Sequence, residues 1–262
     1  SMARWALRSA DLVLPSSTTA ARHIRARFGV GRSLVRPISW GVVRGDFRRA
    51  DGASRRRILA QRRIPQSASI VLNVRKLMPL WGCRVAVDAY TATARVHPDA
   101  HFVFLGGISS EPFVEEARDR VREAGLDSRF TFVEGHVPMN TVAELMSVAD
   151  VFTSLRGSSD MRSASVLQAT AAGGAPVVAD SPEHREMMTL GFDPVLVDPG
   201  DPNEVARAVI DLLGSPERRR VMRAANGLYI EHHEDRSIQL DRMWAEIMTI
   251  CGRGPRRTRE AR

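Results

Sequence analysis

Short apolar runs alternate with amphipathic stretches along most of the chain, from residue 69 to residue 226. The apolar runs are rich in β-branched residues and predict strands at Ser69–Val74, His101–Leu105, Arg129–Val133, Val151–Leu155, Ala175–Ala179 and Pro194–Val197. The amphipathic stretches predict helices at Cys83–Val96, Glu111–Ala124, Asn140–Val148, Ser163–Ala172, Pro182–Leu190, Pro202–Leu213 and Pro216–Asn226. Strands that are apolar throughout and lie between helices are typical of a parallel sheet covered on both faces. The pattern therefore predicts a doubly wound α/β domain, which binds ligands beyond the carboxyl ends of its strands.

The first part of the chain does not follow this alternation. Residues 1–47 predict a strand at Asp11–Leu14, a helix at Ser17–Phe28 and a short strand at Ser33–Pro37. We expect these residues to be a remnant of a second domain. Residues 48–64 are polar and arginine-rich, and they predict a linker that contains a short helix.

The rest of the chain is expected to form one large domain and a tail. Residues 65–250 should make up the Rossmann-like domain. Its last helix, over residues 228–250, should reach back towards the N-terminal remnant. Residues 251–262 show no apolar periodicity and predict a disordered tail.

Composition places the chain among globular proteins, with 44% hydrophobic and 26% charged residues. The net charge is +8 and the pI about 10.8, yet Lys76 is the only lysine among the 38 basic residues. The arginines form short clusters and do not follow one stripe interleaved with aromatic residues, as a nucleic-acid surface would. We therefore expect a solvated basic surface and no nucleic-acid partner. The alternatives for this basic surface are an anionic membrane, which no other feature of the sequence supports, and a partner protein.

Several site chemistries are excluded by the residues present. Lys76 is followed by Leu77, so a P-loop is absent, and the chain has neither a kinase motif set nor a D-x-D metal motif. Cys83 and Cys251 lie far apart, which supports neither a disulfide framework nor a zinc site and fits a reduced, cytoplasmic setting. The stretch His232–Asp235 has the residue types of metal ligands. Adjacent side chains on a helix diverge, so we expect a surface stretch and no metal site.

Five motifs follow one another in order and at consistent spacing: Ala10–Ser17, Ser39–Val43, Arg75–Gly82, Ser159–Ala169 and Thr170–Asp180. Together they resemble the C-terminal half of a retaining family-4 glycosyltransferase, and the resemblance covers residues 5–250. Such enzymes have the GT-B fold of two facing Rossmann-like domains. In the second motif, Trp40 and Val43 stand where the family usually has Asn and Asp. Residues 1–47 would then belong to the acceptor-side domain, and residues 65–250 would bind the nucleotide sugar.

The resemblance implies a donor site for a nucleoside diphosphate sugar. Arg75 and Lys76 can supply charge to the diphosphate, and the helix start at Ser163 and Ser165 can supply free N–H groups without a metal ion. Asp160 takes the position of a catalytic acidic residue that would accept hydrogen bonds from sugar hydroxyls. The alternative is that the basic pair is a solvated loop, that the serines cap a helix, and that Asp160 only complements the helix dipole.

Further positions correspond to the nucleoside part of such a site. Gln168 stands where the family places a ribose-binding glutamate, and an amide loses the charge of that carboxylate. Glu134 and His136 lie on a loop that approaches the base in this fold, or are simply solvated. Glu186 would reach a ribose or join a helix-capping network. Trp81, at a position where the commoner branch has a phosphate-binding lysine, would stack on base or sugar, or be core.

The resemblance implies transfer of a sugar with retention, with this chain supplying the donor half and no cofactor other than the donor substrate. Catalysis in this fold lies between two domains, and an acceptor half would need well over a hundred residues ahead of Asp11. The chain is thus expected to be a cut piece, one subunit of a two-chain enzyme, or a catalytically degenerate nucleotide-sugar binder. An acceptor-domain partner chain or a homo-oligomer is expected. A nucleotide-sugar 2-epimerase of related fold is a distant alternative.

Overall fold

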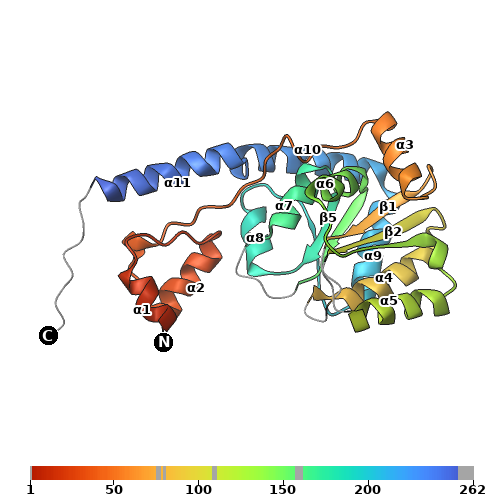
Figure 1. The fold of residues 1–262 in the computed structure, drawn as a ribbon, viewed down its shortest axis with the longest axis horizontal. Coiled ribbons are helices and arrows are strands. Elements are labelled where there is room, and N and C mark those ends of the chain that lie inside the picture. The colour runs from red at the N-terminus through yellow and green to blue at the C-terminus, as the bar shows by residue number, and fades with distance from the viewer. Residues whose placement is uncertain (1, 75–77, 79–80, 108–110, 157–161, 253–262) are drawn as a thin grey trace.

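The computed structural model describes residues 2–74, 78, 81–107, 111–156 and 162–252 (Figure 1). Its centre is a parallel sheet of six strands in the order β3-β2-β1-β4-β5-β6. The strands are β1 (Ser69–Asn73), β2 (Ala100–Gly107), β3 (Phe130–Glu134), β4 (Val151–Ser154), β5 (Ala175–Ala179) and β6 (Val195–Val197). The predicted doubly wound sheet is confirmed, with strand bounds that agree to within about two residues.

Helices cover both faces of this sheet, which is why the strands are apolar on both sides. One face carries α4 (Cys83–Val96), α5 (Glu111–Glu123) and α9 (Pro202–Gly214). The other face carries α3 (Gly52–Gln61), α6 (Met139–Val148), α7 (Ala164–Ala171), α8 (Pro182–Met188) and α10 (Pro216–His233). The chain leaves β1 for β2 on one side and returns to β4 on the other. The crevice between β1 and β4 is therefore the switch point of the sheet, where such folds bind ligands.

Residues 48–64 are held firmly to this domain. Ile58 and Leu59 of α3 are buried in the same core as β1. Arg49 and Arg55 form ion pairs of 2.6 and 3.2 Å with Asp150 at the start of β4. Burial alone would raise the pKa of Asp150, but the two guanidiniums and the Ile70 N–H hold that pKa below its usual value. The predicted linker with its short helix is thus anchored on the sheet domain.

The N-terminal segment is helical and has a small apolar core of its own. It contains α1 (Met2–Ser9) and α2 (Thr18–Phe28), and its buried core residues are Ala21, Val30 and Val35. The strands predicted at 11–14 and 33–37 are wrong, because they reduce to one parallel bridge between Val13 and Val35. An extended segment becomes a strand only where neighbours pair along its length. The assignment of residues 1–47 to a second domain stays a prediction.

The last two helices differ from the predicted pattern. α10 continues through Gly227 to His233, and a short break separates it from α11 (Arg236–Cys251). At the break, the Glu234 carbonyl accepts the Val42 N–H at 2.7 Å and the Asp235 side chain caps α11. A contact with a distant segment therefore sets the break. α11 extends over the N-terminal segment, as predicted, and its Glu246 lies 3.3 Å from Arg36 (Figure 1).

Two further expectations meet the described part of the chain differently. The predicted tail covers residues 251–262, but Cys251 is the last residue of α11, and residues 253–262 lie outside the described residues. Within the described ranges, every helix is too short or too polar to cross a membrane.

Candidate functional site

A pocket of about 330 Å³ opens at the carboxyl edge of the sheet, on the side of α6 and α7. Three sequence-predicted residues line it together: His136, Ser165 and Gln168. The other lining residues lie at or just beyond the ends of β1, β2 and β3, or on α6: Val74, Leu105, Gly106, Gly135, Val137, Val142 and Met146. They were not among the predicted site residues, although Val74 and Leu105 end predicted strands, which was a usable signal. The pocket is largely apolar, with polar groups along the α7 wall.

The start of α7 presents the two predicted serines. Ser163 is the N-cap residue, and its Oγ accepts the Val166 N–H at 3.4 Å. The Ser163 and Ser165 hydroxyls lie 3.2 Å apart. The capping role that the sequence left open is therefore observed for Ser163. Binding of phosphate by either serine stays a prediction.

Glu134 lies at the end of β3 but does not line this pocket. Its carboxylate forms an ion pair with Arg118 of α5, and that guanidinium also lies 5.7 Å from the centre of the Phe132 ring. The contact holds Glu134 on the α5 side of the strand. Its predicted role towards the base stays untested.

Three predicted residues fall outside the described part of the chain: Arg75, Lys76 and Asp160. Trp81 is described and half-buried beside the start of α4. Arg156 lies over its ring, with the guanidinium carbon 4.6 Å from the ring centroid. Arg156 was not among the predicted site residues, and its stacking on Trp81 was not predicted.

Glu186 of α8 caps a helix of the N-terminal segment. Its carboxylate accepts the Thr18 N–H at 2.9 Å, the Thr19 N–H at 2.7 Å and the Thr19 hydroxyl at 2.8 Å. Burial would raise the pKa of Glu186, but these bonds and Arg162 hold the pKa below its usual value. The contacts are those of the helix-capping alternative, and its contact with a ribose stays a prediction.

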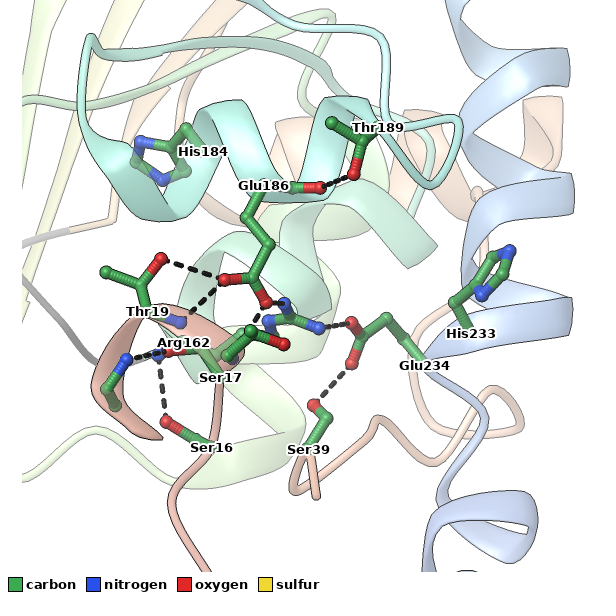
Figure 2. Close-up of polar contacts among 12 residues, drawn as sticks. Ser16, Ser17, Thr19, Ser39, Arg162, His184, Glu186, Thr189, His233 and Glu234 are labelled. Atoms are coloured by element: carbon green, nitrogen blue, oxygen red, sulfur yellow. Dashed lines mark hydrogen bonds and ion pairs between the residues drawn. The ribbon is translucent and has the colours of Figure 1, made fainter. Parts of the chain in front are cut away.

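Arg162 joins Glu186 to a second buried carboxylate (Figure 2). Its guanidinium lies 3.2 Å from Glu186 and also pairs with Glu234, which accepts hydrogen bonds from the Ser39 and Tyr229 hydroxyls. The Arg162 side chain is 6% exposed and that of Glu234 is 0% exposed. Burial would lower the pKa of Arg162, but the surrounding oxygens keep it raised, so the guanidinium stays charged.

This polar cluster of Arg162, Glu186, Glu234, Ser39 and Tyr229 joins segments that are far apart in the sequence. The Arg162 N–H also donates to the Ser16 hydroxyl at 3.0 Å. The expectation that residues 232–235 form a surface stretch is wrong for Glu234, because the connecting segment at residues 39–42 covers it. Among the described residues, no group of His, Cys, Asp and Glu has the arrangement of a metal site.

A parallel sheet with a pocket beside its switch point defines a doubly wound, ligand-binding α/β protein. The chain belongs to a particular family of this class, because the model of the family "Glycosyl transferases group 1" matches residues 54–227. It is 27% identical over 236 residues to a D-inositol 3-phosphate glycosyltransferase from Acidothermus cellulolyticus. That match covers 88% of this chain and 52% of the relative, so the chain spans about half the length of this relative.

Solved glycosyltransferase structures share the fold. HepE of Anabaena, in complex with UDP and glucose, superposes with a TM-score of 0.80 at 16% identity, covering 92% of this chain and 64% of HepE. Sucrose-phosphate synthase from Thermosynechococcus elongatus gives a TM-score of 0.79 at 19% identity, covering 96% of this chain and 61% of the synthase. These similarities confirm the resemblance to GT-B glycosyltransferases and the fold class it implied.

Proposed function

We propose that this chain supplies the donor half of a retaining glycosyltransferase that uses a nucleoside diphosphate sugar without a metal ion. The observation that carries the proposal is the pocket at the carboxyl edge, where His136, Ser165 and Gln168 meet around apolar walls. Family membership supports the reaction class, and the UDP held by HepE supports the ligand class.

In this proposal the pocket receives the nucleoside. The apolar walls, from Leu105 and Val142 among others, favour a planar base because they remove its faces from water. Gln168 offers its amide oxygen to a ribose hydroxyl, as a neutral acceptor. The first N–H groups of α7 favour negative charge at its start.

Transfer further needs an acceptor opposite the donor. Asp160 is proposed to hold the donor sugar by its hydroxyls, and the acceptor is proposed to bind on another domain or on a partner chain. Retention would appear as an unchanged anomeric configuration in the product, which NMR of the product reads directly.

One residue favours a second candidate, a nucleotide-sugar-binding module without transferase activity. A hydrogen bond to a charged group contributes about 1.5–3 kcal/mol, against about 1 kcal/mol for a neutral one. Gln168 at the ribose position therefore weakens donor binding compared with a glutamate. A donor-hydrolysis and transfer assay separates the two candidates.

Calorimetric titration with UDP, GDP, ADP and TDP, each with and without EDTA, tests the binding site. We expect one of these nucleotides to bind equally well in both conditions. Ser165→Tyr fills the pocket and should abolish binding, whereas Ser33→Tyr, on an exposed turn, should leave binding unchanged. No binding by any nucleotide, binding that needs a metal ion, or binding that survives Ser165→Tyr would contradict the proposal.

A further inference from the structure

Arg156 lies at the switch point of the sheet, just beyond the end of β4. β4 pairs with β1, and Val74 at the end of β1 lines the proposed nucleotide pocket. Trp81 and Gly82 lead from the same edge into α4. Arg156 and the start of α4 therefore flank the crevice next to the pocket.

Among the residues that the structure describes, the guanidinium of Arg156 has a stacking partner but no hydrogen-bond partner. It lies 4.6 Å from the centroid of the Trp81 ring, and its Nε is buried with no acceptor in this part of the chain. Within the described ranges, no carboxylate lies within ion-pairing distance of this guanidinium. An aromatic face attracts the charge but leaves the in-plane N–H groups without an acceptor. A buried donor in that condition is costly unless a ligand satisfies it.

The backbone segments that carry Trp81 and Arg156 are in close contact. Gly82 has a φ of +67°, and a Cβ at this position would lie 2.9 Å from the Leu155 carbonyl oxygen and Cβ. The turn before α4 is thus pressed against the residue that precedes Arg156. Gly82 is also the N-cap of α4, and it has no side chain to bond the first N–H groups of this helix. The start of α4 and the guanidinium are held at the same edge of the sheet.

We propose that Arg156, held on the face of Trp81, binds the diphosphate of the nucleotide at the crevice between β1 and β4. The planar fork of a guanidinium matches two phosphate oxygens, and the stacked ring fixes its plane while leaving its edge open. Trp81 thereby acts as a platform for the cation, a role beyond the two that the sequence left open. This inference rests on the proposed function of the pocket.

The test compares ligands with and without phosphate. Arg156→Met should weaken UDP binding about tenfold or more, as expected for loss of a charged hydrogen bond, and should leave uridine binding unchanged. Arg156→Lys should give an intermediate UDP affinity, because it keeps the charge without the fork. Trp81→Leu should weaken UDP binding to a lesser degree than Arg156→Met. Calorimetry measures UDP, and ligand-detected NMR measures uridine.

Arg185→Met is the matched control, because Arg185 is an exposed arginine that pairs only with Asp180 among the described residues. It should leave UDP affinity unchanged. Equal weakening of UDP and uridine by Arg156→Met, or no weakening of UDP, would overturn the role of Arg156. Binding of inorganic pyrophosphate gives a readout that needs no nucleoside pocket. Loss of pyrophosphate binding in Arg156→Met, with an intermediate affinity in Arg156→Lys, supports the inference, whereas failure of the unsubstituted chain to bind any nucleotide overturns the proposed function.

Discussion

The substitution Arg162→Met removes the cation that joins Glu186 to Glu234. Methionine keeps much of the apolar stem of arginine, so the change acts mainly on charge. Both carboxylates then stay behind in a buried site with their mutual repulsion unbalanced. Removing one partner of a buried ion pair costs about 3–5 kcal/mol. We expect a loss of this size, since the Arg162 side chain is 6% exposed and Glu234 is 0% exposed.

Urea unfolding followed by circular dichroism measures the free energy of unfolding of each variant. Arg220→Met is the matched control, because Arg220 pairs with Glu217 on the surface of α10 at 68% exposure and should tolerate the change. The double variant Arg162→Met/Glu234→Gln should be more stable than Arg162→Met alone, because it removes one uncompensated charge. If Arg162→Met lowers the free energy of unfolding no more than Arg220→Met does, the ion pairs of Arg162 do not stabilise the fold.

Three further outcomes are expected. Gln168→Glu should strengthen UDP binding by about 1 kcal/mol, read by calorimetry, and unchanged or weaker binding would place Gln168 outside the ribose site. Burial, together with the charge of Arg129, lowers the pKa of His101 from 6.5 to about 4. Between these two pH values His101 is therefore protonated in the unfolded chain and neutral in the folded chain. The free energy of unfolding should fall by about 3 kcal/mol as pH drops from 6.5 to 4, and an equal fall in His101→Gln would refute this assignment. Gly82→Ala should destabilise the fold by about 1–3 kcal/mol, because the backbone at Gly82 is left-handed. Gly227→Ala, in open space on α10, should instead raise the melting temperature, because alanine favours a helix more than glycine does. Equal effects of the two substitutions would contradict this role of Gly82.

The sequence determined the sheet because its signals are local. The four central strands β2, β1, β4 and β5 are mostly apolar runs buried on both faces, and such runs stand out within a few positions. Helix starts depend on local signals as well. The Ser163 side chain, a possible cap from the sequence, bonds to an N–H group of its own first turn, and Pro202 stands in the first turn of α9 as predicted. The order of these elements predicted the switch point. Ser165 and Gln168, which the family resemblance pointed to, line the pocket beside it, and their roles towards a ligand stay predictions.

Only the tertiary structure decided the partners of the polar residues. Glu234 has the same local sequence whether it is solvated or buried, and it is buried because Ser39 and Tyr229 lie against it. Along the chain, Arg156 is separated from Trp81 by the three strands β2, β3 and β4 and the helices between them, so no local pattern pairs them. Hydrophobic burial is non-directional and follows periodicity along the chain, whereas ion pairs, hydrogen bonds and ring stacking need particular atoms within a few ångströms. Those atoms come together only when the chain has folded.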